Sequence, residues 1–238
     1  MPMTELQLTQ IRNYLLEKKL PIDILMEVED HFLLQISNEM DKEEMTFEEA
    51  FLKTKNSWAD ELSWETPFYI LVNRADATIT KFESRVRRDA QWSTFKLSLF
   101  ISLLIMILLL WVNRINGSQY YLFFLTAFFL SCFAFAFLPI IYNIIMNSEA
   151  YKKKYQHYKF SVYHDRIVVA FSFVYFMLMY LKPFDEWFSA FINLEFSQFI
   201  LFKALCLMAL YFILVYTGIW QIRFAKKMKK IKKFLKLA

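Results

Sequence analysis

The stretch 97-LSLFISLLIMILLLWV-112 decides the fold of this chain. It holds sixteen residues without a charge, a proline or a glycine. At about 1.5 Å rise per residue, a helix over this stretch and its lead-in at 94–96 just crosses a hydrocarbon core of about 30 Å. We therefore predict a membrane-spanning helix, which divides the chain into an acidic front and an apolar back with a basic end.

The composition of the chain favours lipid as its solvent. Of 238 residues, 57% are hydrophobic and 19% aromatic, and only two are glycine. The net charge of +5 conceals a split, because residues 1–80 carry −9 and residues 81–238 carry +14. Such a split predicts one small water-soluble domain followed by a membrane domain. Cys132 and Cys206 both lie in apolar runs, which favours free buried thiols over a disulfide.

Residues 1–90 predict an acidic, cytoplasmic domain built from helices. A first helix is expected over 4–19, and Pro21 suits the first turn of a second one. Thr46 and Glu49 form a capping box that starts a third helix, ending near Trp58. A long polar helix from Pro67 should lead toward the membrane, and no strand pattern is present. The apolar stripe of the second helix consists of Ile24, Leu25, Val28, Phe32 and Ile36.

Residues 91–222 predict a transmembrane bundle of four helices, and hence an all-α fold. The N-terminus lacks a basic and apolar leader, so the first span should act as an uncleaved signal anchor. Pro139 should kink the second span and free the carbonyl of Phe135. Asn143 should bond a neighbouring helix or that carbonyl. The four spans are expected at about 94–112, 120–146, 163–184 and 197–222.

The positions of lysine and arginine predict the orientation of these spans. The segments 81–96, 147–166 and 223–238 together carry 18 such residues, and the two intervening loops carry 2. Because positive charge favours the cytoplasmic side, both termini and the middle loop should be cytoplasmic. The sequence therefore predicts a multi-pass protein of the inner membrane of a bacterium.

Motifs for catalysis or cofactor binding are not recognisable. Gly117 and Gly218 are the only glycines, which excludes a phosphate-binding loop and a dinucleotide fingerprint. The serines of the spans have no base within reach along their helices, and no Asp, Glu or His lies at depth. Glu27 and His31 are spaced like two zinc ligands, but no third ligand has a recognisable spacing. We therefore expect no enzyme activity, catalytic residue, cofactor or metal site.

The tail 223–238 predicts a basic amphipathic helix. An apolar stripe runs along it at spacings of four and three residues, from Phe224 through Met228 and Ile231. This pattern is typical of a helix that lies on anionic lipid headgroups, whereas base-stacking aromatic residues are too sparse for nucleic-acid binding. The residues expected to contact lipid are Lys226, Lys227, Lys229, Lys230, Lys232 and Lys233.

The segment 20-LPIDILMEVEDHFLLQISNEMDKEEMTFEEAFLKTKNSW-58 has a further distinctive layout. A helix begun by proline bears the acidic pattern E-x-x-D-H-F, and an acidic linker leads to a T-F-E-E-A-F helix. Over residues 4–60, this layout resembles the short helical prefix domains of bacterial membrane proteins, the HAAS/DUF1700-like group. That group is often linked with PadR-type transcription regulators. The resemblance implies a signalling or interaction module without catalytic residues.

Together these features predict a regulatory or scaffolding membrane protein. Its acidic domain would bind an unidentified cytoplasmic or membrane protein through Glu27, Glu29, Asp30 and His31. The alternative is transport, as a small permease or as an accessory subunit of a transporter. Since the acidic domain and the basic tail should share one side of the membrane, we also expect them to attract each other, in competition with anionic lipid.

Overall fold

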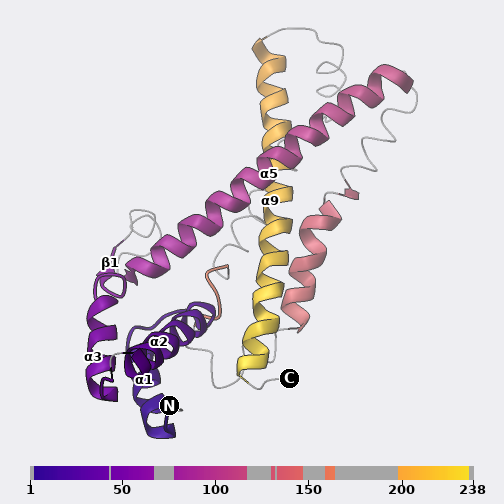
Figure 1. Ribbon diagram of the computed structural model, residues 1–238. Coiled ribbons are helices and arrows are strands. Elements are labelled where there is room, and N and C mark those ends of the chain that lie inside the picture. The colour runs from indigo at the N-terminus through magenta and orange to yellow at the C-terminus, as the bar shows by residue number, and fades with distance from the viewer. Residues whose placement is uncertain are drawn as a thin grey trace. The chain divides into compact units, whose positions relative to one another are not determined.

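The computed structural model is mostly helical (Figure 1). It describes residues 3–42, 44–66, 78–116, 130–131, 133–146, 159–163 and 198–235. The chain forms two compact units. Unit 1 comprises Met1–Ala90, Glu149–His164 and Lys227–Ala238, and unit 2 comprises Gln91–Ser148 and Asp165–Lys226. The acidic domain is thus joined by parts of a predicted loop and of the predicted tail.

Unit 1 begins with three helices: α1 (Glu5–Glu17), α2 (Ile22–Lys42) and α3 (Phe47–Ser57). The predicted capping box of α3 is confirmed, because the backbone N–H of Glu49 donates to the Thr46 hydroxyl and the Glu49 carboxylate accepts from the N–H of Thr46. Thr4 and Gln7 make the same reciprocal pair at the start of α1. Both helices therefore begin where their own sequence satisfies the free backbone donors.

The core of unit 1 follows the predicted apolar stripes. The five stripe residues of α2 are all buried, as are Ile11 and Leu15 of α1. The ring of Phe32 lies 5.9 Å from that of Tyr14 and 5.5 Å from that of Trp58, so one residue of α2 joins α1 to the end of α3. Aromatic pairs at these separations add stability beyond their buried area.

The connection from α3 to the next helix differs from the prediction. Trp64–Glu65 (β1) and Ile79–Thr80 (β2) pair as a short antiparallel ladder, whereas the sequence predicted no strand and placed Ile79 in the helix from Pro67. The helix α5 (Lys81–Asn116) starts only after β2, because the Thr80 hydroxyl accepts from the backbone N–H of Glu83 and so caps it. The residues between the strands, 67–77, lie outside the described residues.

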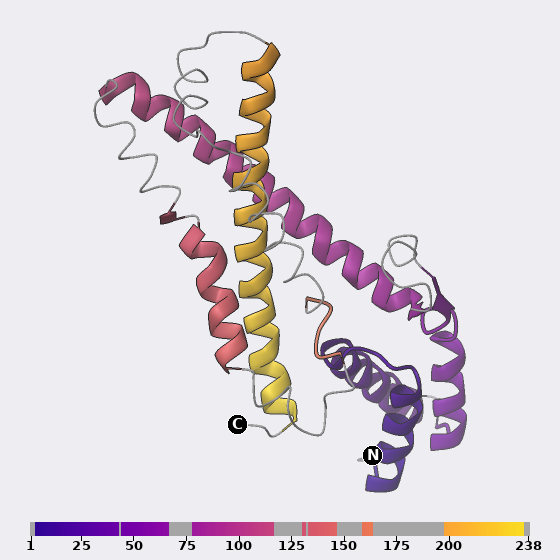
Figure 2. The same cartoon turned by 180° about the vertical axis from the view of Figure 1, so that it is seen from behind.

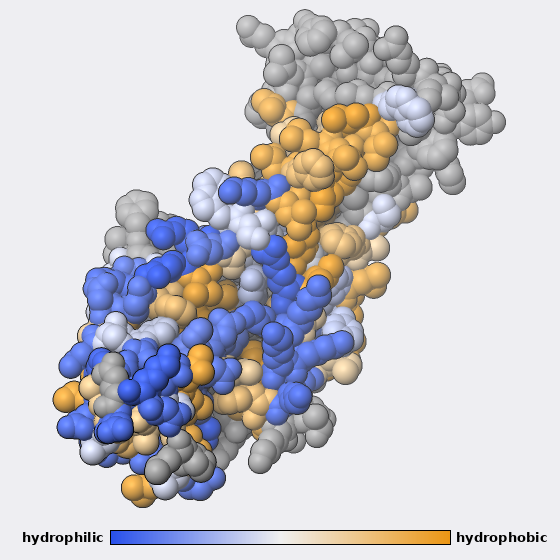
Figure 3. All heavy atoms as spheres, viewed as in Figure 1, coloured by the Kyte–Doolittle hydropathy of each residue, from blue (hydrophilic) through white to orange (hydrophobic). Residues whose placement is uncertain are grey.

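The helix α5 contains the charge-free stretch 97–112. Among the described residues, Lys81–Leu108 is the one helix long and apolar enough to cross a membrane. Only 28% of its most apolar window is buried, whereas a core helix of a soluble protein is mostly buried. Figure 3 shows hydrophobic side chains gathered along this helix. Large exposed hydrophobic residues of this helix include Phe100, Leu104, Ile107 and Trp111.

The described residues contain one candidate span and not the predicted four. Of the second predicted span, the structure describes the apolar helix Phe133–Met146, which by itself is shorter than a membrane span, and residues 120–129 lie outside the described residues. The third, 163–184, lies almost wholly outside the described residues. The fourth falls within α9 (Gln198–Phe234), which does not qualify as a candidate on its described residues.

Two helices of unit 2 pack closely against each other. The helix Phe133–Met146 runs beside α9 in both views (Figures 1 and 2). A methyl group at Gly218 would lie 2.4 Å from the ring of Phe135 and 2.9 Å from its carbonyl oxygen. That carbonyl is the one left without its usual helical donor by Pro139. A residue without a side chain is therefore required where α9 passes it.

Polar side chains also join the helices of unit 2. The Asn143 amide donates to the backbone carbonyl (3.1 Å) and to the side-chain oxygen (2.9 Å) of Gln221, which confirms that Asn143 bonds a neighbouring helix. Arg223 of α9 donates to the hydroxyls of Thr94 (2.7 Å) and Ser93 (2.9 Å) on α5. These contacts fix how the helices pack, because their polar groups have few other partners among apolar neighbours.

Candidate tail-docking and protein-binding site

The four residues predicted to bind a partner are not one surface. Glu27, Asp30 and His31 are exposed on α2, but Glu29 is buried, at 5% exposure. Glu29 stands four residues after Leu25 and three before Phe32, so it borders the buried stripe. Its carboxylate accepts from the guanidinium of Arg12 on α1 at 2.7 Å. Glu29 therefore joins two helices inside the domain and is not accessible to a partner.

Glu27 already has a partner from the far end of the sequence. Its carboxylate accepts a hydrogen bond from the ammonium of Lys227 at 2.5 Å. Burial acts to lower the pKa of Lys227, but the hydrogen bond and charge of Glu27, with the charge of Asp23, outweigh it, so this pKa lies above its usual value. The basic tail thus touches the acidic domain within unit 1.

A second segment of unit 1 docks beside this ion pair. The backbone N–H groups of Ile22 and Asp23 donate to the carbonyls of Lys159 (2.9 Å) and Phe160 (3.2 Å). The Ser161 hydroxyl donates to the Asp23 carboxylate at 2.6 Å. The first turn of a helix has backbone N–H groups without helical partners, and here the segment 159–163 supplies the missing acceptors.

Asp23 is the buried carboxylate at the centre of this site. Asp23 is 4% exposed, and it was not among the site residues predicted from the sequence. Burial raises its pKa to about 6, and the hydrogen bond from Ser161 and the charge of Lys227 oppose this rise only in part. Its position two residues after Pro21, in the first turn of the helix, was the available signal, since acidic residues favour first turns.

The lysines predicted to bind lipid fall into different environments. Lys226, Lys229, Lys230 and Lys233 are exposed, Lys232 is partly buried, and Lys227 is engaged by Glu27. The apolar stripe between them is not available, because Phe224, Met228 and Ile231 are all buried. In this structure the tail continues α9 without a break and hides the apolar face that contact with lipid would need.

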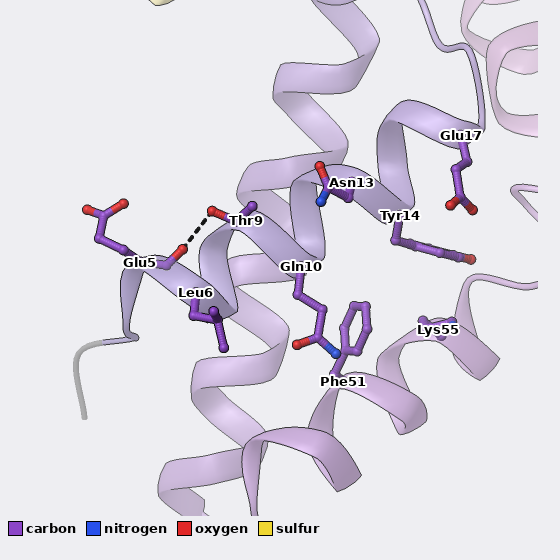
Figure 4. Close-up of a pocket in the computed structure, with 9 residues that line it drawn as sticks. All are labelled: Glu5, Leu6, Thr9, Gln10, Asn13, Tyr14, Glu17, Phe51 and Lys55. Carbon is purple, nitrogen blue, oxygen red and sulfur yellow. Dashed lines mark hydrogen bonds between the residues drawn. The ribbon is translucent and has the colours of Figure 1, made fainter.

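A separate groove lies between α1 and α3 (Figure 4). It is open and has a volume of about 800 Å³. The rings of Tyr14 and Phe51 meet edge to face in it, with their centroids 6.0 Å apart, and the ammonium of Lys55 lies 4.8 Å from the centre of the Tyr14 ring. The pKa of Tyr14 is raised by burial and by the nearby charge of Glu17. Leu6 stands at one end of the groove with 80% of its surface exposed.

Groups suited to catalysis or metal binding do not assemble in the described part of the chain. No three His, Cys, Asp or Glu side chains there lie close enough to hold a metal ion. His31 lies beside Trp58, with ring centroids 6.1 Å apart. Ser98 and Ser102 are buried, and each donates to the backbone carbonyl four residues earlier, Thr94 and Ser98 respectively. Such bonds give a serine a structural role within a helix.

Comparison with known proteins adds no family to these observations. No family model, no curated protein and no solved structure matches the chain. The resemblance to the HAAS/DUF1700-like group therefore stays a prediction.

Proposed function

We propose that this chain is a regulatory or scaffolding protein of a bacterial inner membrane whose acidic cytoplasmic domain binds a protein partner. The observation that carries the proposal is the ion pair between Glu27 and Lys227, together with the burial of Met228 and Ile231. Through this ion pair the acidic surface of α2 receives a basic amphipathic helix. A surface of this kind is suited to recognising helices of other proteins.

The exposed apolar side chains of the domain support a binding role. Leu6, Leu34 and Leu52 expose 80%, 61% and 57% of their surface on an otherwise charged domain, and Leu6 borders the groove between α1 and α3. The pairing of apolar contacts with surrounding charge is common at protein interfaces. The membrane part then serves to hold the domain at the bilayer.

The first test concerns the membrane part, for which we propose four spans with both termini in the cytoplasm. In a chain without Cys132 and Cys206, single cysteines at Ser118 and Ser189 should react with an impermeant thiol reagent in intact cells. A cysteine at Ser148 should react only after lysis. Labelling at Ser148 in intact cells would overturn this topology.

The second test concerns the partner. A photoreactive amino acid placed singly at Leu6, Leu34 or Leu52 of the full chain should give a discrete, heavier adduct with another protein in living cells. The matched control is the same residue at Phe32, which is buried and should give no such adduct. If none of the three exposed positions produced an adduct above the control, the proposal of a protein partner would be wrong.

A further inference from the structure

The first turns of α2 form a docking surface that two other segments of unit 1 already use. The segment 159–163 accepts from the backbone N–H groups of Ile22 and Asp23, and Lys227 binds Glu27 one turn further along. Asp23 and Glu27 are separated by four residues, so they lie on the same face of α2. This face, from Ile22 to Glu27, is called the α2 docking face below.

The tail shows what kind of helix the α2 docking face accepts. Lys227 supplies the cation, and Met228 and Ile231, one and four residues later, are buried at 2% and 1% exposure. A lysine followed by apolar residues at these spacings presents one face of a helix. Lys229 and Lys230 of the tail are exposed, so the contact between the tail and α2 is the ion pair of Lys227 with Glu27.

We propose that the α2 docking face is the site at which the partner binds, that the partner presents a lysine-bearing amphipathic helix, and that the tail Lys227–Ala238 is its built-in competitor. This inference rests on the proposed function. It replaces the earlier set of four partner residues, because Glu29 is buried against Arg12 and only Glu27 of that set engages a basic helix. The partner would take the place of the tail at Glu27.

The charge distribution of the chain supports competition at this face. Residues 1–80 carry a net charge of −9, which attracts basic helices over about a Debye length of 8 Å at physiological salt. The tail is tethered, so its effective concentration at the face is on the order of millimolar. A partner must bind the face strongly enough to displace a tail at this effective concentration. The tail therefore sets the lowest affinity at which a partner can bind.

The experiment measures binding of a fluorescent peptide with the sequence 223–238 to the full chain in nanodiscs of zwitterionic lipid, by anisotropy. The intact chain should bind the peptide weakly, because its own tail occupies the face. Lys227→Gln in the chain weakens that competitor and should tighten peptide binding by about fivefold or more. Adding Glu27→Gln to this variant should weaken peptide binding by about tenfold.

The matched control is Asp30→Asn, which removes the same charge from an exposed position of α2 outside the docking face. It should change peptide binding less than twofold. A peptide of the same composition with its apolar residues moved off one helical face should bind at least tenfold more weakly. If Glu27→Gln and Asp30→Asn weakened peptide binding equally, the attraction would be diffuse and the proposal would be wrong. The proposal would also be wrong if Lys227→Gln did not tighten peptide binding.

A lipid surface is the competing ligand for the same peptide. If, in nanodiscs containing anionic phosphatidylglycerol, all peptide binding became independent of Glu27, the tail would be a lipid-binding helix and the proposed competition would be wrong. The peptide-binding and photo-crosslinking experiments test the docking face and the protein partner separately. Specific peptide binding without any cellular adduct would refute the protein partner and leave the docking face as an internal contact. Adducts without Glu27-dependent peptide binding would refute only the docking face.

Discussion

Protonation of Asp23 should control how firmly α2 is held. This carboxylate is buried at the start of α2, where it accepts from the Ser161 hydroxyl at 2.6 Å and from the backbone N–H of Ile24 at 3.0 Å. Burial raises its pKa from 3.8 to about 6, against the opposing effects of Ser161 and of the Lys227 charge. The other charged group on this face is Glu27, which is paired with Lys227.

The sign and the size of the pH effect follow from this raised pKa. Between pH 3.8 and about 6 the folded state holds a proton that the unfolded state has lost, so stability falls as the pH rises through this window. The whole shift corresponds to about 3 kcal/mol. Between pH 5 and pH 7.5 the expected loss is about 1.4 kcal/mol, a factor of about ten in the opening equilibrium. Above pH 7 the contribution of Asp23 is constant.

Hydrogen exchange measured by mass spectrometry on the full chain in detergent micelles tests this directly. After correction for intrinsic exchange, peptides that cover Ile22–Lys42 should open about tenfold more often at pH 7.5 than at pH 5. Asp23→Asn cannot ionise and should abolish this difference while keeping an acceptor for Ser161. Asp30→Asn is the matched control and should retain the difference. If α2 opening depended on pH in Asp23→Asn as it does in the original chain, Asp23 would not be the group that causes this dependence.

Three further predictions concern packing. Gly218→Ala should destabilise unit 2 by about 1–3 kcal/mol, because its methyl group meets the ring and carbonyl of Phe135. The measurement is the unfolding temperature in detergent, and an unchanged temperature would contradict that close approach. Arg12→Ala should lower the free energy of unfolding in denaturant by about 2 kcal/mol, because it leaves buried Glu29 unpaired. Changing both Arg12 and Glu29 to methionine should recover most of this loss. If the double variant were no more stable than Arg12→Ala, an unpaired Glu29 would not be the cause. Phe32→Asp should lower the free energy of unfolding by more than about 4 kcal/mol, since it places a charge at a fully buried position. The acidic domain should then lose its thermal unfolding transition. An intact transition would exclude Phe32 from the core.

Local sequence patterns predicted the helices of the acidic domain well. The capping box at Thr46 starts α3 in the structure, and the apolar stripe that includes Phe32 is buried. The exposed apolar surface of α5 follows from the charge-free stretch 97–112. These features depend on residues within a few turns of each other, where helical periodicity and capping are sufficient.

Helical periodicity did not predict the burial of Glu29 or the strand at Ile79. Glu29 lies at the edge of the α2 stripe, and only the approach of Arg12 from α1 makes its burial tolerable. In the same way, Ile79 suited a helix by its spacing, but its pairing in β2 and the cap provided by Thr80 delay the start of α5. In both cases a neighbour distant in sequence overrides the local preference.

The sequence by itself determined that this chain has an acidic helical front, an apolar helix able to cross a membrane and a basic amphipathic end, because charge, length and periodicity are properties of contiguous residues. Only the tertiary structure decided that the basic end meets Glu27 and that Ser161 meets Asp23. Those pairs are separated by 200 and 138 positions along the chain. Opposite charges indicate that such segments attract, but the contact that forms depends on which backbone donors and apolar faces the fold brings together.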